Sequence, residues 1–275
     1  MNFVTYFDKN YIPKFSAMAD SLLRHEKKAD LWAFTCDTES RHAVNDHDVW
    51  GISVGKLEKV FPELCDARGN REWVEYMWTL TPFVMQFMML EWKLEEIAYV
   101  DADLYFFSDL GELYTEAGDN DICAIPHRWS PEHSKRLATN GKYNVSWLRV
   151  LNTEEGVAFL KEWGDLCIDS CIRDNKCMGD QGHIDYLERV YDIYDIQHLG
   201  ANLAPWSQKQ YNYHMEDGQV YVEQDKLLFY HLHEFLHSDN GSTLRRTGYD
   251  LHPFVAEHVY PEYEAEIKRI CGGLG

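Results

Sequence analysis

Apolar and polar positions alternate along the chain in blocks that predict strands and helices in turn. Short runs rich in β-branched and aromatic residues, as strands are, lie at 3–7, 31–35, 97–103, 121–125, 143–150 and 227–233. Apolar residues recur with helical spacing at 17–28, 71–94 and 156–171. This alternation predicts an α/β fold in which a mixed, mostly parallel sheet is flanked by helices.

Two further features concern the helices and the number of domains. Pro82 follows Thr81 inside the segment 71–94, and because proline disfavours a continuous helix, we expect a break there. A last helical pattern at about 261–270 predicts a surface helix near the C-terminus. The sequence shows no internal repeat, low-complexity tract or linker, so we expect residues 1–275 to form a single domain.

Composition and charge narrow the function. The chain has 275 residues, of which 45% are hydrophobic, so it can bury a sizeable core. Its formal net charge of -20 repels phosphate backbones, which argues against nucleic acid as a partner. The seven cysteines form no compact disulfide framework, and neither a signal peptide nor a transmembrane segment is apparent. We therefore expect a cytoplasmic protein with reduced thiols.

Two aspartates interrupt the apolar run IAYVDADLYFF at 97–107. On a strand, Asp101 and Asp103 share one face and Ala102 lies on the other. The apolar residues before them place the pair at the carboxyl end of a buried strand, where open α/β sheets bind ligands. Two close carboxylates repel each other and resist desolvation, and a divalent cation relieves both effects. Oxygen ligands suit Mg²⁺ or Mn²⁺.

Other interpretations of the pair stay open. An isolated D-x-D is more often a turn with two solvated aspartates. A calcium loop is a further alternative because Glu112 lies at its last ligand position. Tyr105 and Phe106, however, occupy positions that need an oxygen ligand and a glycine.

Several motifs, taken in order, resemble those of GT-A fold glycosyltransferases, especially the family 8-like nucleotide-sugar transferases of bacterial surface-polysaccharide synthesis. YVDADLYFFSD looks like the D-x-D segment, and EYMWTLTPFVMQFMML precedes it as the family's sugar-contacting helix does. YNVSWLRVLN resembles the acceptor-side strand, MGDQGHIDYL the D-Q segment, and GANLAPW followed by LLFYHLHEF the late metal-histidine segment. The resemblance implies a GT-A (Rossmann-like nucleotide-diphospho-sugar transferase) fold. It also implies transfer of a sugar, with retention of configuration, from a nucleoside-diphosphate sugar to a glycan or lipid-linked sugar acceptor.

The resemblance also gives residues roles. It implies Mn²⁺ (or Mg²⁺) bound by Asp101, Asp103 and His231, with His233 as the substitute ligand on the same strand face. It places Asp180 and Gln181 near the reacting carbon, although Asp180 alone would be read as a helix cap. The residues that it implies in contact with the donor are Asp8, Asn10, Tyr11, Arg71, Ala102, Asn144 and Asn202.

The chain departs from that family in three places. Arg71 lies far upstream of the position where the family's arginine stands, so it would either take over the sugar or phosphate contact or simply pair with Glu75 at i,i+4. No K-P-W follows His231, and only Arg245 and Arg246 are available there to neutralise a leaving diphosphate. Ser146 stands where a glycine is usual, which leaves the acceptor-side geometry open.

A second metal motif competes with the first. His233, Glu234 and His237 spell H-E-F-L-H, which on a helix would hold Zn²⁺ in a metallopeptidase. The strand character before it and the SDNGS after it leave little room for that helix. A non-catalytic carbohydrate- or nucleotide-binding module is a third alternative, but it gives no reason for the aspartate pair. Cys167, Cys171 and Cys177 do not have a zinc spacing, so we expect buried structural thiols.

Overall fold

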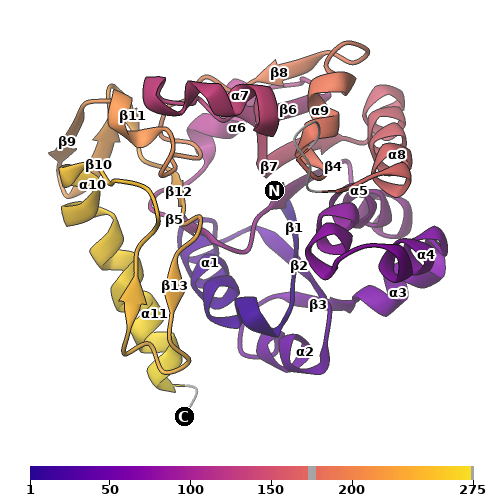
Figure 1. The fold of residues 1–275 in the computed structure, drawn as a ribbon, viewed down its shortest axis with the longest axis horizontal. Coiled ribbons are helices and arrows are strands. Elements are labelled where there is room, and N and C mark those ends of the chain that lie inside the picture. The colour runs from indigo at the N-terminus through magenta and orange to yellow at the C-terminus, as the bar shows by residue number, and fades with distance from the viewer. Residues whose placement is uncertain (173–177, 274–275) are drawn as a thin grey trace.

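The computed structural model describes residues 1–172 and 178–273 and is built around a seven-stranded sheet (Figure 1). The strand order is β3-β2-β1-β4-β7-β6-β8. These strands are β1 (Asn2–Phe7), β2 (Asp30–Thr35), β3 (Trp50–Ser53), β4 (Glu96–Val100), β6 (Ile122–Pro126), β7 (Tyr143–Leu151) and β8 (Ile193–Asp195). The first four pair in parallel, β7 runs antiparallel to both neighbours, and β8 is parallel to β6. The predicted α/β fold with a mixed, mostly parallel sheet is confirmed.

Helices cover both faces of this sheet (Figure 1). The helices are α1 (Ile12–His25), α2 (Thr38–Val44), α3 (Val54–Val60), α4 (Glu63–Asn70), α5 (Trp73–Trp92), α6 (Gly111–Ala117), α7 (Leu137–Asn140), α8 (Glu154–Asp169), α9 (Gln181–Leu187), α10 (Pro253–His258) and α11 (Tyr260–Gly273). In β1, Val4 and Tyr6 belong to the core cluster with α5 and α8, while Phe3 and Phe7 belong to the cluster with α1. Because successive side chains of a strand point to opposite faces, a strand buried on both faces reads as one apolar run.

The predicted break at Pro82 is wrong, since α5 is a single helix from Trp73 to Trp92. Proline cannot donate to the carbonyl four residues earlier, which is that of Trp78. The hydroxyl of Thr81 lies 3.2 Å from this carbonyl oxygen and can donate to it when the carboxyl of Asp180 does not take the same hydrogen. Eleven residues of α5 are buried, among them Pro82, so packing also favours the helix over a break.

The strand predicted at 97–103 is also shorter than expected. β4 ends at Val100, and the chain turns through Asp101 to Asp103 before a separate strand, β5 (Leu104–Phe106). The late strand predicted at 227–233 covers only β12 (Phe229–His231), which pairs antiparallel with β5. This pairing sets His231 opposite Leu104, directly beside the turn that carries the aspartates.

The C-terminal part packs against the first helix. The helix predicted at about 261–270 runs from Tyr260 to Gly273 and contacts α1. It is not wholly a surface helix, because one face, including Tyr263 and Ile267, is fully buried. The small strands of this half are β9 (Tyr213–Glu216), β10 (Gln219–Val222), β11 (Asp225–Lys226), β13 (Leu236–His237) and β14 (Leu244–Arg245). Among the described residues, no helix combines the length and apolar character needed to cross a bilayer.

Candidate metal centre and active site

A pocket of about 630 Å³ opens at the carboxyl ends of the parallel strands. Asp8 follows β1, Asp101 follows β4 and His127 follows β6, and all three line it. Because β7 runs the other way, it contributes Asn144, near its first residue. Strand direction therefore gathers polar residues from distant parts of the sequence into one place, as is typical of open α/β sheets.

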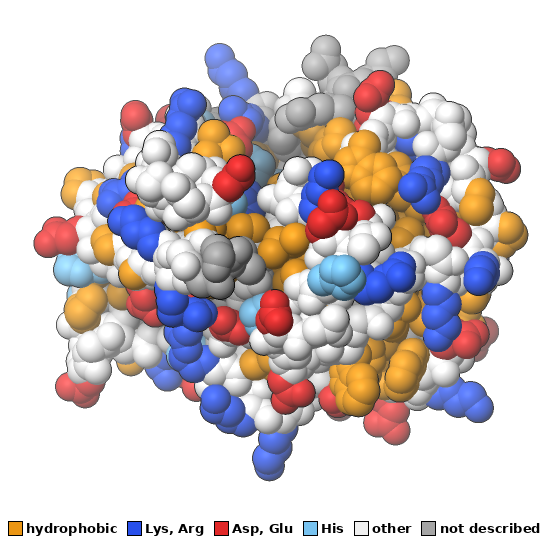
Figure 2. Space-filling view, turned by 90° about the horizontal axis from the view of Figure 1, so that it is seen from below, with side chains coloured by type: hydrophobic (Ala, Val, Ile, Leu, Met, Phe, Trp, Pro, Cys, Tyr) orange, Lys and Arg blue, Asp and Glu red, His pale blue; other side chains and the backbone are white. Residues whose placement is uncertain are grey.

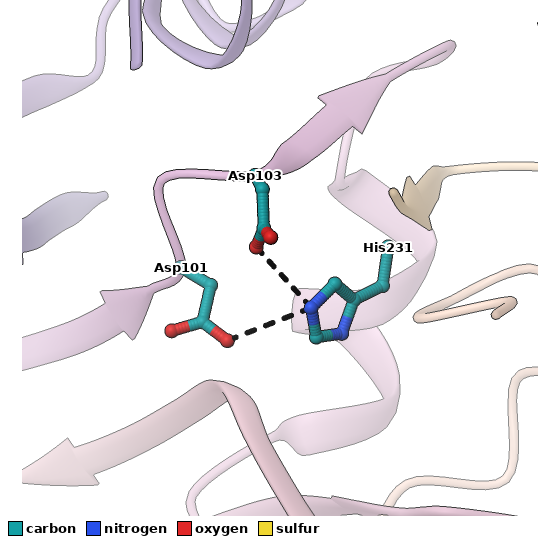
Figure 3. A group of neighbouring side chains, drawn as sticks. All are labelled: Asp101, Asp103 and His231. Carbon is teal, nitrogen blue, oxygen red and sulfur yellow. Dashed lines mark ion pairs between the residues drawn. The ribbon is translucent and has the colours of Figure 1, made fainter. Parts of the chain in front are cut away.

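Asp101, Asp103 and His231 form a compact cluster on the wall of this pocket (Figure 3). The Nε2 atom of His231 lies 3.2 Å from a carboxylate oxygen of Asp103 and 3.8 Å from one of Asp101. The three potential ligand atoms all lie within 4.8 Å of one another. The side chains of Asp103 and His231 are almost buried, while that of Asp101 is 31% exposed. The cluster therefore has one open side, and that side faces the pocket.

Burial and neighbouring charges together shift the pKa of each member of the cluster. Burial raises the pKa of Asp101 to about 6, and the nearby carboxylate of Asp103 adds to this effect. Burial alone would also raise the pKa of Asp103, but His231, together with Lys14, holds it below its usual range. The Lys14 ammonium lies 3.6 Å from Asp103. Burial opposes protonation of His231, yet the charge of Asp103 outweighs it and raises the His231 pKa. Without a metal ion, these two cations neutralise the aspartates.

The orientation of His231 is set by hydrogen bonds on its other nitrogen. Its Nδ1 donates to the amide oxygen of Asn144 at 3.2 Å, and the same oxygen accepts from Asn202 at 2.9 Å. A hydrogen on Nδ1 leaves the lone pair of a neutral imidazole on Nε2, which faces the aspartates. Support of this kind is typical of metal-binding histidines. Two carboxylates and one imidazole nitrogen are a donor set that fits Mn²⁺ or Mg²⁺, with Mn²⁺ accepting the nitrogen more readily.

His233 lies close to this cluster but is held differently. Its ring centre is 5.6 Å from that of His231, and it lines the pocket at the start of a turn. Burial lowers the pKa of His233 to about 4, and the neighbouring His231 adds to the shift. It does not join the compact group formed by the other three side chains.

Asp180 and Gln181 line another side of the pocket. Asp180 caps α9 by accepting from the Gln181 backbone amide at 2.9 Å, so the capping role expected from sequence is present. Its other oxygen lies 2.7 Å from the hydroxyl of Thr81 on α5, and that hydroxyl lies 3.0 Å from the hydroxyl of Tyr6. Burial raises the pKa of Asp180 to about 7. A buried carboxyl that titrates near neutrality in a pocket is typical of functional sites.

The residues after β1 form a third side. Asp8 caps a short 3₁₀ helix at Lys9–Tyr11 by accepting from the backbone amide of Asn10. Its second oxygen accepts from the indole of Trp73 at 2.9 Å. Asp8, Asn10, Tyr11 and Ala102 all line the pocket. The structure therefore brings these four predicted donor contacts to the same cavity as the aspartate pair.

Two predicted donor contacts are placed elsewhere. Arg71 donates to the backbone carbonyls of Cys167 and Ile168 at 2.7 and 2.8 Å, and it does not line the pocket. Asn202 reaches the site only through Asn144. Of the two later arginines, Arg246 pairs with Glu264 at 2.8 Å, and neither it nor Arg245 lines the pocket. Among the described residues, Arg136 is the one lysine or arginine that does.

Sequence reasoning missed several residues of the site. Lys14 gave no signal, because a lysine in the first turn of a helix is ordinary on a surface. The aromatic residues Trp129 and Tyr249 lie in irregular segments, and Arg136 ends a short 3₁₀ helix at Pro131–Arg136; none of the three belongs to a motif. Only the spacing of the surrounding strands could have suggested that the connection between β6 and β7 borders the site.

The alternative zinc motif is not supported by its geometry. His233 and Glu234 lie in a turn, Glu234 has a φ of 60°, and His237 belongs to the strand β13. The motif needs two histidines one helical turn apart, so the metallopeptidase interpretation is wrong. Cys167 and Cys171 are fully buried in the core, as expected for structural thiols, and Cys177 lies outside the described residues.

Two proteins of Bacillus subtilis (strain 168) are similar to the chain in sequence. YfnD is 29% identical over 244 residues, which cover 85% of this chain and 78% of YfnD. YfnF is 22% identical over 242 residues, which cover 83% of this chain and 80% of YfnF. Both carry the description "uncharacterized protein", so neither states an activity. No protein-family model matches the chain.

Solved structures show the same fold. Mouse xyloside xylosyltransferase 1 superposes with a TM-score of 0.54 at 13% sequence identity, over 84% of this chain and 97% of that one. The glycosyltransferase GlyE of Streptococcus pneumoniae TIGR4 gives a TM-score of 0.55 at 14% identity, over 99% of this chain and 62% of that one. Likeness at such low identity establishes the fold alone. The chain therefore has the GT-A fold of glycosyltransferases.

Proposed function

We propose that this protein is a metal-dependent glycosyltransferase that moves a sugar from a nucleoside-diphosphate sugar to an acceptor hydroxyl. The observation that carries the proposal is the cluster of Asp101, Asp103 and His231. It lies on the wall of a pocket at the carboxyl ends of the parallel strands, in a GT-A fold. The proposal includes the roles that the sequence predicts for the other site residues. It also includes a single domain over residues 1–275.

The charge of the pocket supports dependence on a metal. Five acidic side chains line its described part, Asp8, Asp101, Asp103, Asp180 and Glu234, against one arginine. A diphosphate would be repelled by this surface unless a bound cation lay between them. Asp101, Asp103 and His231 would hold Mn²⁺ or Mg²⁺, with His233 as a substitute for His231. Such an ion supplies electrostatic stabilisation where negative charge grows on the leaving diphosphate.

The protein's own residues would orient the donor. Asp8, Asn10 and Tyr11 would contact the nucleoside, and Ala102 and Asn144 would also contact the donor. Asp180 and Gln181 would lie beside the reacting carbon. Gln181 donates through its side chain to the backbone carbonyl of Asn140 at 2.7 Å, which fixes its amide at the pocket wall. Fixed polar groups of this kind contribute because they need no reorganisation during the reaction.

The pathway and location are also proposals. The motif pattern favours a retaining enzyme of bacterial surface-polysaccharide synthesis, acting on a glycan or lipid-linked sugar in the cytoplasm. Nucleic acid is not an expected partner, because the net charge is -20. Figure 2 shows lysine and arginine side chains dispersed among acidic ones over one face, rather than gathered into one basic surface.

A donor screen tests the proposal. The purified protein is incubated with Mn²⁺ and a panel of nucleotide sugars, and the release of nucleoside diphosphate is measured with and without EDTA. We expect one donor to be hydrolysed slowly in a metal-dependent way. Asp101→Asn should abolish this release, while Asp119→Asn, which removes an exposed carboxylate outside the pocket, should not. Release that is insensitive to EDTA and to Asp101→Asn would contradict the proposal.

A further inference from the structure

One wall of the pocket is made of packed rings. We call it the aromatic wall; it consists of His127, Trp129, Trp206, His233 and Tyr249. His127 stacks on Trp129 with ring centres 4.3 Å apart, and Trp129 lies 5.7 Å from Trp206. Trp206 in turn lies 5.3 Å from His233 and 6.5 Å from Tyr249. Neither the metal centre nor the predicted donor contacts require a surface of this size.

The polar groups of the two indoles in the wall are bonded within the protein. The indole of Trp206 donates to the carbonyl of His127 at 2.9 Å, and that of Trp129 donates to the carbonyl of Gly141 at 3.3 Å. Trp206 is almost fully buried, so it supports the wall from behind. Trp129 and Tyr249 are only half-buried and remain accessible. With the indole N–H groups satisfied internally, these rings offer a ligand apolar faces.

The wall itself carries little charge. Burial lowers the pKa of His127 to about 3, so this ring is neutral near pH 7. An uncharged aromatic surface favours the C–H face of a pyranose ring, since aromatic side chains that line pockets bind ligands through their flat faces.

A single cation stands at the edge of the wall. The guanidinium of Arg136 lies 5.3 Å from the centre of the Tyr249 ring, a cation–π contact that holds the side chain at the pocket. Among the described residues it has no carboxylate within 4.0 Å, whereas Arg24, Arg68, Arg149, Arg246 and Arg269 each pair with a glutamate or aspartate. The residue is exposed, and a guanidinium beside a pocket without a paired carboxylate is suited to bind an anion from a ligand.

That anion is not the diphosphate of the donor. The diphosphate would lie at Asp101 and Asp103, next to His231. The ring centre of His233 lies 5.6 Å from that of His231, and the ring centre of Tyr249 lies 6.4 Å from that of His233. Arg136 contacts Tyr249 and is therefore two rings away from His231. The cation therefore serves a group bound farther along the wall.

We propose that the acceptor is an acidic sugar, whose pyranose ring stacks on Trp129 and Tyr249 while its carboxylate or phosphate pairs with Arg136. This inference rests on the proposed transferase function, because it assigns the acceptor side of the same pocket. The feature common to the possible acceptors is a pyranose with an anionic substituent, and uronic acids and sugar phosphates both have it.

Titration with acidic and neutral sugars tests the inference. Binding of p-nitrophenyl β-glucuronide, p-nitrophenyl β-glucoside and glucose 6-phosphate is measured by isothermal calorimetry on the full chain with Mn²⁺ and nucleoside diphosphate present. We expect at least one acidic ligand to bind about 10-fold more tightly than the neutral glucoside, as one charge-assisted contact gives. The glucuronide and the phosphate arms distinguish the two kinds of anion.

Two variants test which residues bind the acidic sugar. Arg136→Gln should bring the ratio of the dissociation constants for acidic and neutral sugars close to one, and Tyr249→Leu should weaken both. Lys135→Gln is the matched control, because this exposed neighbour does not line the pocket. Equal binding of acidic and neutral sugars by the unmodified protein, an acid preference that persists in Arg136→Gln, or binding of none of the three would each overturn the inference. Metal-dependent nucleotide binding, measured in the same samples, tests the proposed transferase function separately.

Discussion

Replacing Asp180 with asparagine should make the protein more stable at neutral pH. The carboxyl group is buried, with its pKa raised from 3.8 to about 7, so ionising it in the folded state is unfavourable. In the unfolded chain it ionises near 3.8. Between these values the folded state binds more protons than the unfolded state, so this group lowers stability as pH rises. The loss is complete above about pH 7.

The size of the effect follows from the shift. A difference of about 3 pH units corresponds to about 4 kcal/mol at high pH, at about 1.4 kcal/mol per unit. At pH 5 the same group lowers the free energy of unfolding by only about 1.6 kcal/mol, because pH 5 is only about one unit above the pKa of the carboxyl in the unfolded chain. Asparagine does not ionise, so the advantage of the variant should widen by about 2.5 kcal/mol between pH 5 and pH 8.

Hydrogen bonding supports the choice of asparagine. Its oxygen can accept from the Gln181 amide, and its NH₂ group can donate to the Thr81 hydroxyl, in place of the two carboxylate contacts. Thr81 is then free to donate to the Trp78 carbonyl, which Pro82 leaves without its helical partner. An ionised Asp180 takes that single hydroxyl hydrogen for itself. The neutral form therefore satisfies the network better.

Urea denaturation at pH 5 and pH 8, followed by tryptophan fluorescence, measures the effect. Asp20→Asn is the control of opposite sign. Burial alone would raise the pKa of Asp20, but His47 and Arg269 lower it, so its stabilisation is present above pH 4 and the variant should be less stable at both pH values. An Asp180→Asn variant whose advantage does not grow from pH 5 to pH 8 would refute the reasoning. A stabilised variant with impaired sugar transfer would support a functional reason for the aspartate.

Three further predictions concern the candidate metal centre. Asp103→Asn should lower the free energy of unfolding by about 3 kcal/mol in chemical denaturation without metal, because it leaves Lys14 buried without its partner; unchanged stability would contradict this ion pair. His231→Ala should weaken Mn²⁺ binding in calorimetry far more than His237→Ala, because the Nδ1 atom of His237 bonds to the carbonyl of Ser238 and the residue does not line the pocket; the reverse order would exclude His231 as a ligand. Asn144→Leu should weaken Mn²⁺ binding about 10-fold by freeing the His231 ring, as loss of such support does at other metal sites; unchanged Mn²⁺ affinity would show that the ring is fixed by other contacts.

The sequence by itself determined the features that depend on neighbouring residues. Runs such as 3–7 and 31–35 are apolar on both faces, and a strand buried on both sides requires this. The order of strands and helices then limits the fold to an α/β sheet with a ligand edge. The position of Asp101 and Asp103 at the end of an apolar run sufficed to predict a polar site there, because it depends only on chain direction.

The tertiary structure decided which distant residues join that site. Three histidines lie between 231 and 237, and local spacing does not separate them. The antiparallel pairing of β5 with β12 selects His231, since it sets that residue beside the turn. Lys14 joins through helix packing, and Arg71 is taken up by two carbonyls of α8. The continuity of α5 through Pro82 likewise depends on packing and on the Thr81 hydroxyl. Contacts between residues far apart in the chain have energies that a local pattern does not contain, and these contacts completed the site.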